Sequence, residues 1–152
     1  MVREGELAPD FEAVAHDGSR VRLSDLRGKW VVLYFFPKAF TPGCTREARS
    51  FSAEWGEFRK MGVEVMGVSR DDPATLARFA EAEGAGFKFI SDQDGSVAKA
   101  YGVLGMLGMA DRVTFVIDPE GKVAGVVKGF SVRPDQHPEA ALRVVTQRAR
   151  QQ

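Results

Sequence analysis

Cys44 is the only cysteine in the chain, and it lies in a polar loop that ends in Thr41-Pro42-Gly43-Cys44. An apolar run at 31–36 leads into this loop, and a pattern typical of a helix follows it. We therefore expect the sulfur at the first turn of a helix, where unpaired N–H groups and the positive end of the helix dipole favour an anion. A thiol placed there ionises more easily than a free one, and the thiolate is the nucleophile.

A lone cysteine is more often a small buried hydrophobic residue without a chemical role. Three features favour chemistry at Cys44: its loop is polar, it opens a helix, and it follows a strand that is expected to be buried. The carboxyl ends of the strands are where α/β sheets place their sites. The position of the cysteine therefore predicts a reactive thiol.

Two residue types in the loop could support that thiol. Thr41 stands three residues before Cys44, so its hydroxyl could reach the sulfur or a substrate oxygen, or it could cap the helix. Pro37 and Pro42 fix the backbone of the loop and remove two donors, which would shape and dry a pocket. Either proline could equally be an ordinary turn residue.

Two charged residues could complete the site. Arg112 begins a predicted central strand, where its charge must reach a partner, a ligand or solvent because burying it unpaired is prohibitive. Glu47 lies three residues after Cys44, on roughly the same helical face, and could pair with an arginine near the site or lie on the surface.

Several other chemistries lack their residues. Cys44-Thr45-Arg46-Glu47 is not a Cys-x-x-Cys dithiol, and Ser50 stands where a cysteine phosphatase loop requires arginine. His16 and His137 are far apart in the sequence and make a poor metal-binding set with Cys44. A Cys–His protease pair stays formally open but has no local support, and no glycine-rich nucleotide loop follows a strand.

The elements expected around the loop indicate an α/β fold with a central mixed sheet flanked by helices. Strands at 11–14 and 20–23 would form an N-terminal β-hairpin, followed by a helical turn at 24–28. Further strands are expected at 31–36, 63–68, 87–90, 113–117 and 123–127. Helices are expected from Cys44 to Gly62, from Pro73 after an Asp72 cap, at 96–101 and at 137–149.

Length and composition predict one domain over residues 1–152, with a hydrophobic content of 44%. Lys plus Arg and Asp plus Glu are 21 each, so no global basic field favours nucleic acid or a membrane surface. No apolar stretch has the length of a membrane span, and the N-terminus lacks the order of a signal peptide. We therefore expect a cytoplasmic protein.

The motif Pro37-x-x-x-Thr41-x-x-Cys44 resembles the active-site signature of peroxiredoxins. The wider string at 34–45 is similar to the bacterioferritin-comigratory, or Q-type, branch of that family. The segments at 5–11, 23–29, 91–95 and 112–118 also follow the family order, so the resemblance covers nearly the whole chain.

The resemblance implies a thioredoxin-like fold and a peroxidase that reduces hydrogen peroxide and organic hydroperoxides without metal or organic cofactor. In that interpretation Cys44 is the peroxidatic cysteine, Thr41 the hydroxyl contact, Pro37 the shielding proline and Arg112 the stabilising arginine. Glu47 matches a supporting glutamate of the family.

One position departs from many Q-type members, which carry a resolving cysteine five residues after the peroxidatic one. That position is Arg49, so a sulfenic acid on Cys44 cannot be resolved within the chain. An external thiol is expected instead: a low-molecular-weight thiol, or a thioredoxin-like or glutaredoxin-like protein. A Cys44–Cys44 bond between two chains is a further alternative.

Two other functions stay open on sequence grounds: a monothiol redox protein, and a peroxide-sensing or holdase-like module. We expect a monomer or a weak dimer. The apolar stretch at 103–109, just before Arg112, could be a loop wall, a pocket lining or an interface patch.

Overall fold

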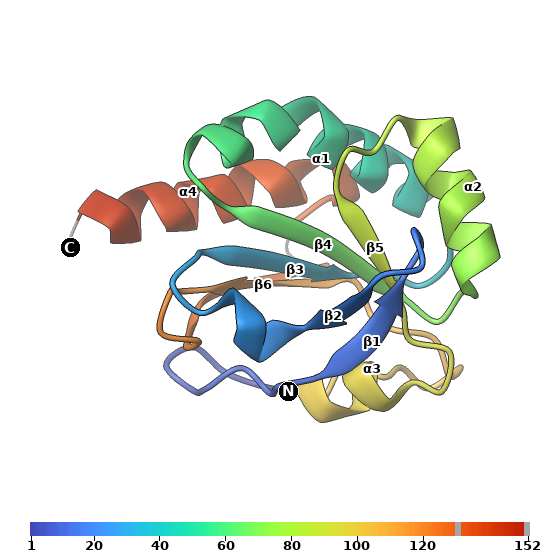
Figure 1. Ribbon diagram of the computed structural model, residues 1–152, viewed down its shortest axis with the longest axis horizontal. Helices are drawn as coiled ribbons and strands as arrows, with labels where there is room; N and C mark the ends of the chain where they lie inside the picture. The colour runs from blue at the N-terminus through green and yellow to red at the C-terminus, as the bar shows by residue number, and fades with distance from the viewer. Residues whose placement is uncertain (130–131, 151–152) are drawn as a thin grey trace.

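The structure, a computed structural model, describes residues 1–129 and 132–150. A seven-stranded mixed sheet in the order β2-β1-β5-β4-β3-β6-β7 forms its middle layer (Figure 1). The strands are β1 (Glu12–Ala15), β2 (Arg20–Arg22), β3 (Val31–Phe35), β4 (Glu64–Ser69), β5 (Lys88–Ser91), β6 (Val113–Ile117) and β7 (Val123–Lys128). Strands β3, β4 and β5 are parallel, while β6 runs antiparallel to β3 and to β7.

Helices cover both faces of the sheet. On one face lie α1 (Pro42–Lys60), α2 (Pro73–Glu83) and α4 (His137–Arg150), and on the other lies α3 (Ser96–Tyr101) with the 3-10 turn at Leu23–Leu26 (Figure 1). A second 3-10 turn, Pro134–Gln136, leads into α4. Because both faces are covered, every residue of β3 and of β6 is buried, which explains their continuous apolar runs.

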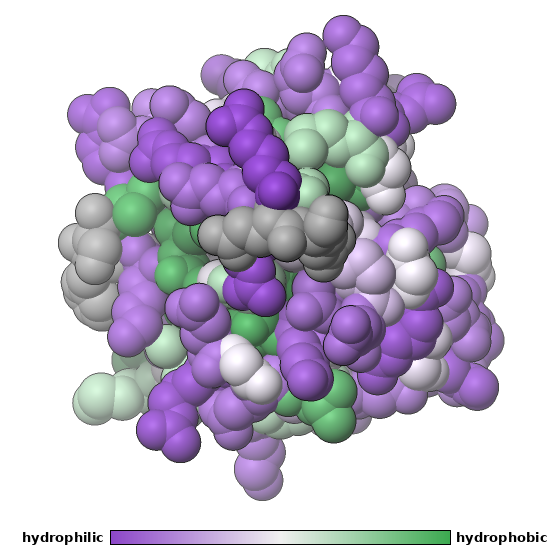
Figure 2. Space-filling model, turned by 90° about the vertical axis from the view of Figure 1, so that its left-hand side faces the viewer, coloured by the Kyte–Doolittle hydropathy of each residue, from purple (hydrophilic) through white to green (hydrophobic). Residues whose placement is uncertain are grey.

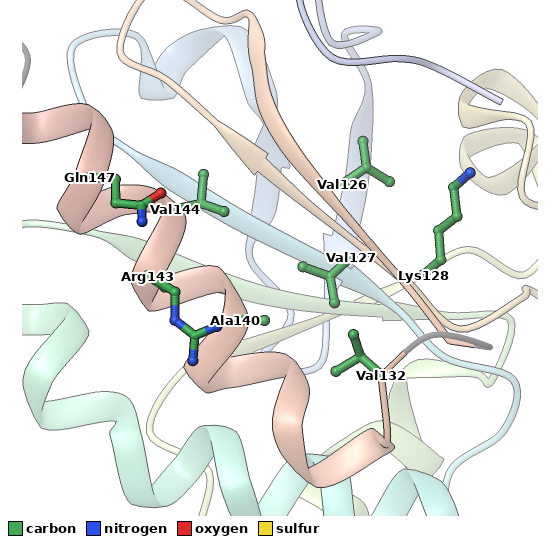
Figure 3. A pocket seen from close by; sticks show the side chains of 8 residues that line it. All are labelled: Val126, Val127, Lys128, Val132, Ala140, Arg143, Val144 and Gln147. Atoms are coloured by element: carbon green, nitrogen blue, oxygen red, sulfur yellow. The ribbon is translucent and has the colours of Figure 1, made fainter.

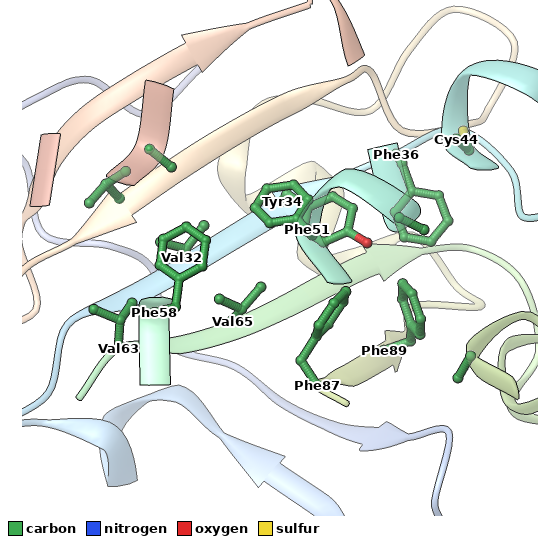
Figure 4. Packing of buried hydrophobic residues seen from close by; sticks show 14 of the residues in the cluster. Val32, Tyr34, Phe36, Cys44, Phe51, Phe58, Val63, Val65, Phe87 and Phe89 are labelled. Carbon is green, nitrogen blue, oxygen red and sulfur yellow. The ribbon is translucent and has the colours of Figure 1, made fainter. Parts of the chain in front are cut away.

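The two faces carry separate hydrophobic cores. Alternate residues of β3 point to opposite sides, so Val32 and Tyr34 join the core under α1 while Leu33 joins the core under α3. The ring of Tyr34 stacks on that of Phe51 from α1, with 4.1 Å between centroids (Figure 4). Cys44 lies at the edge of this aromatic core, on the side of Phe36.

The predicted elements are confirmed, with every strand boundary within one residue of the expected one. The N-terminal hairpin forms by antiparallel pairing of β1 with β2. Asp72 caps α2 by accepting from the N–H of Thr75. The strand expected from Val63 begins at Glu64, because the N–H of Val63 is bonded to the carbonyl of Phe58 in the turn that ends α1.

The surface view of one end of the molecule is mainly hydrophilic, with small and separate hydrophobic areas (Figure 2). Within residues 1–129 and 132–150, no helix combines the length and the apolar character that crossing a membrane requires.

Candidate active site

Cys44 is the third residue of α1, and its side chain is almost fully buried, with 1% exposure. Thr45 donates the first helical hydrogen bond, to the carbonyl of Thr41 at 2.9 Å. The N–H groups of Gly43 and Cys44 come before this bond and therefore have no partner within the helix. The sulfur therefore lies at the positive end of a long helix, as predicted.

Arg112 lies beside Cys44 because of the register between β3 and β6. Val113 pairs with Phe35 in this antiparallel pair, so the residue that precedes β6 and the loop that follows β3 meet at the same edge of the sheet. Nη2 of Arg112 donates to Sγ of Cys44 at 3.4 Å. The predicted arginine is thus in contact with the predicted nucleophile.

Glu47 completes this contact from the next turn of α1. Nη1 of Arg112 donates to Oε1 of Glu47 at 2.6 Å, with side-chain exposures of 16% for the arginine and 0% for the glutamate. Glu47 is therefore part of the site rather than of the surface. Burial raises the pKa of Glu47 to about 8, against the lowering effect of Arg112.

The same guanidinium is itself held in the charged form. Burial opposes its charge, but Glu47 and Cys44 together raise the pKa of Arg112 above its ordinary value. Gly43 leaves room for this arrangement, because a Cβ built at that residue would lie 3.0 Å from Nη2 of Arg112.

Thr41 is the N-cap residue of α1 by position, but its side chain makes no capping hydrogen bond. Its hydroxyl instead donates to the carbonyl of Lys38 at 2.7 Å. The hydroxyl therefore closes the loop before Cys44 in this structure, and the helix-cap alternative for its side chain is wrong.

The loop is anchored by Asp71, which sequence reasoning missed. Oδ2 of Asp71 accepts from the N–H of Ala39 at 2.8 Å and from the hydroxyl of Ser69 at 2.7 Å. Phe40 next to Ala39 has a left-handed backbone with φ 68°, so the loop is held in a conformation that non-glycine residues rarely adopt. The available signal was the position of Asp71 just after β4, the parallel neighbour of β3.

A cavity of about 750 Å³ opens beside Arg112, although Cys44 and Thr41 are not among the residues that line it. Pro37, Arg112, Val113 and Gly129 line it together with Met1, Lys128 and most of residues 104–111. The apolar stretch before Arg112 is therefore a pocket lining, in which Leu107 and Met106 stay highly exposed. Arg70 fixes this wall by donating through Nη1 to the carbonyl of Gly108 at 2.5 Å.

A smaller hollow of about 330 Å³ lies between β7 and α4 (Figure 3). Its lining includes Val126, Val144 and the charged Lys128 and Arg143, and it contains none of the predicted site residues. The larger cavity, where Pro37 and Arg112 lie, is therefore the candidate substrate pocket.

Two further buried residues extend the site on the side of α4. Nδ1 of His137 lies 3.6 Å from Oε2 of Glu47 and 2.8 Å from Oγ1 of Thr114. No local pattern in the sequence places His137 at this site, and the sequence indicates only a poor metal ligand there. A threonine inside the apolar strand at 113–117 was the one available signal.

Arg49 lies away from the sulfur, on the exposed side of α1. It pairs with Glu83 of α2, with 2.5 Å between Nε and Oε1. The position at which the resemblance implies a resolving cysteine in many chains therefore holds an exposed arginine, paired here with a largely buried glutamate.

The fold and the site together define a thioredoxin-like thiol peroxidase. Residues 5–126 match the AhpC/TSA family. Peroxiredoxin Bcp of Escherichia coli strain K12 is 37% identical over 155 residues, which cover 97% of this chain and 98% of that protein.

Solved structures agree with this match. Peroxidoxin BcpB from Mycobacterium tuberculosis has a TM-score of 0.89 and 36% identity, over 97% of this chain and 98% of that one. The bacterioferritin comigratory protein of Xanthomonas campestris has a TM-score of 0.85 and 32% identity, over 91% and 92%. The chain belongs to the AhpC/TSA family and is a peroxiredoxin of the Bcp or Q type with a single cysteine.

Proposed function

We propose that Cys44 is the peroxidatic cysteine of this thiol-dependent peroxidase, and that Arg112 is its stabilising partner. The observation that carries the proposal is the double contact of one guanidinium, which donates to Sγ of Cys44 and to Oε1 of Glu47. A cation fixed in this way favours the thiolate and the negative charge that develops on the leaving oxygen.

The reaction begins with attack of the Cys44 thiolate on the terminal hydroperoxide oxygen. An S–O bond forms as the O–O bond breaks, and the electron pair leaves on the other oxygen, which takes a proton to become water or an alcohol. The sulfur is oxidised to a sulfenic acid and the peroxide is reduced. Pro37 would shield the sulfur from bulk water, and the Thr41 hydroxyl would turn from the carbonyl of Lys38 to hold the peroxide in line.

The cavity supports organic hydroperoxides as substrates alongside hydrogen peroxide. The Xanthomonas campestris relative is described as reducing alkyl peroxides. In this chain, the apolar residues before Arg112 would receive an organic tail while the hydroperoxide group points to the cysteine.

Recycling requires an external thiol. That thiol condenses with the sulfenic acid, releasing water and leaving a mixed disulfide, which a second thiol reduces. Because Cys44 is only 1% exposed, a bulky reductant reaches its sulfur only when the first turn of α1 opens. A thioredoxin-like or glutaredoxin-like protein or a small thiol would serve, and a reducing compartment such as the cytoplasm would supply it. We further propose that the chain acts as a monomer or a weak dimer.

The test is rapid mixing with hydrogen peroxide, followed by the fluorescence of Trp30 and Trp55, for the parent and for Cys44→Ser. We expect a fast change in the parent that is lost in the variant. A parent no faster than a free thiol would overturn the peroxidase assignment. If every candidate thiol supports only a single turnover, the peroxide-sensing alternative replaces the catalytic cycle.

A further inference from the structure

A chain of buried polar groups leads away from the thiol, and only its first member, Glu47, enters the proposed function. Glu47, Thr114 and His137 each have 0% exposure. Oε2 of Glu47 has no hydrogen-bond partner, one of only two such buried side-chain atoms within residues 1–129 and 132–150. A buried oxygen of this kind requires an explanation, since leaving it unpaired is costly.

The hydrogen bonds of His137 show what Oε2 faces. Nε2 of His137 lies 3.3 Å from the carbonyl of Val132, which can only accept, so Nε2 carries the ring hydrogen. Burial, with a smaller effect from Arg112, lowers the pKa of His137 to about 4, so the ring is neutral at pH 7. Nδ1 is then an acceptor, and the hydroxyl of Thr114 donates to it at 2.8 Å.

Oε2 of Glu47 lies 3.6 Å from Nδ1, which is beyond hydrogen-bond distance, and the one lone pair of that nitrogen already accepts from Thr114. The neutral ring therefore offers Oε2 neither a donor nor a positive charge, and this surrounding disfavours the ionised form of Glu47. The titratable groups that face Glu47 are Cys44 on α1, Arg112 before β6, His137 on α4 and Tyr34 on β3. Of these, only Arg112 brings a positive charge.

Charge balance leads to the same result. With the thiolate formed, one cation serves two acids, and an ionised Glu47 would leave a net negative charge in a buried site. A neutral Glu47 leaves the arginine and the thiolate as a balanced pair. We propose that Glu47 works as a protonated carboxyl, so that the full charge of Arg112 acts on the Cys44 thiolate.

Each residue of the chain then has a positioning role. Thr114 and the carbonyl of Val132 keep His137 in one neutral form, the neutral ring brings no positive charge to Oε2 of Glu47, and Oε1 of Glu47 aims the guanidinium at the sulfur. This inference rests on the proposed function, because it assigns the charge state of that same site. The raised pKa of Glu47 agrees with it.

The first test compares Glu47→Gln with Glu47→Ala. The glutamine copies the protonated acid, since it is neutral and its carbonyl oxygen accepts from Arg112. We expect Glu47→Gln to be oxidised by peroxide about tenfold faster than Glu47→Ala. Equal losses in the two variants would show that a negative charge is required at this position, and would overturn the proposal.

The second test needs no peroxide, so its failure is separate from failure of the peroxidase assignment. Infrared difference spectra of the parent should contain the carbonyl band of a protonated buried carboxyl at neutral pH, lost as the pH rises through about 8. The band should be absent from Glu47→Gln and retained in Glu57→Gln, an exposed control on the same helix. A neutral-pH spectrum without that band would overturn the proposal whatever the kinetics show.

Discussion

Oδ2 of Asp71 lies 2.8 Å from the main-chain nitrogen of Ala39, and this hydrogen bond ties the loop after β4 to the loop that carries the thiol. The two loops leave neighbouring parallel strands at the same edge of the sheet, so one short side chain can span them. The bond holds the loop in place at Phe40, where the backbone is left-handed.

Asp71→Ala should therefore slow the reaction of Cys44 with peroxide by about tenfold, since the loop that aligns the peroxide loses its anchor. It should also lower the free energy of unfolding by about 1–2 kcal/mol. Asp72→Ala is the matched control, because loss of its helix cap costs about 1 kcal/mol without touching the loop. Stopped-flow mixing measures the rate of peroxide attack in each variant, and urea unfolding measures the free energy of unfolding. Similar rate losses in Asp71→Ala and Asp72→Ala would contradict the anchoring role of Asp71.

Arg112→Lys should slow peroxide attack by about 10- to 100-fold. A guanidinium reaches Cys44 and Glu47 with two nitrogens at fixed geometry, whereas an ammonium offers one nitrogen to both. Arg49→Lys, on the exposed side of α1, should keep the parent rate. A parent-like rate in Arg112→Lys would mean that a positive charge is enough to stabilise the thiolate, and that the two fixed nitrogens of the guanidinium are not required.

Much of this site follows from the sequence, because its main parts are local. Cys44 and the start of its helix are set by the Thr41-Pro42-Gly43 turn, and Arg112 by its place before an apolar strand. The burial of Glu47 does not follow, since it depends on α4 folding back over β6 to cover that face of α1. Asp71 and His137 join the site through contacts between segments far apart in the chain, which no local pattern encodes.

Without an external thiol, the parent should consume one equivalent of peroxide and then accumulate overoxidised Cys44. The sulfenic acid has no second cysteine to condense with, so excess peroxide carries it to the sulfinic acid. Mass spectrometry of the intact chain should show one added oxygen at low peroxide and two at high peroxide, and none in Cys44→Ser. A covalent dimer at one equivalent would instead indicate a Cys44–Cys44 bond between chains.

His137 should make an acid-sensitive contribution to the stability of the fold, opposed by Glu47, whose raised pKa stabilises the fold as the pH falls below about 8. The pKa of His137 is about 4 in the folded protein and ordinarily 6.5, so the unfolded chain takes up a proton first as the pH falls. The stabilising contribution of His137 is present above pH 6.5 and lost between there and about 4, by up to roughly 3 kcal/mol.

Urea unfolding over that pH range measures this loss in the parent and in His137→Gln, which should show a shallower decline. His16→Gln is the control, because it changes the one other histidine and leaves the buried one in place. Parallel declines in the parent and His137→Gln would assign the acid sensitivity to other groups.

Leu107→Ser should change the choice of substrate rather than the reactive thiol. Leu107 lines the cavity next to Arg112 and is 85% exposed, so the substitution removes apolar surface with little cost to the fold. We expect kcat/KM for an organic hydroperoxide with a long apolar tail to fall by about three- to tenfold, and that for hydrogen peroxide to stay unchanged. Leu7→Ser, an exposed leucine outside the cavity lining, should alter neither value. Equal losses for both peroxides in Leu107→Ser would show that this wall supports the site as a whole instead of receiving the organic tail.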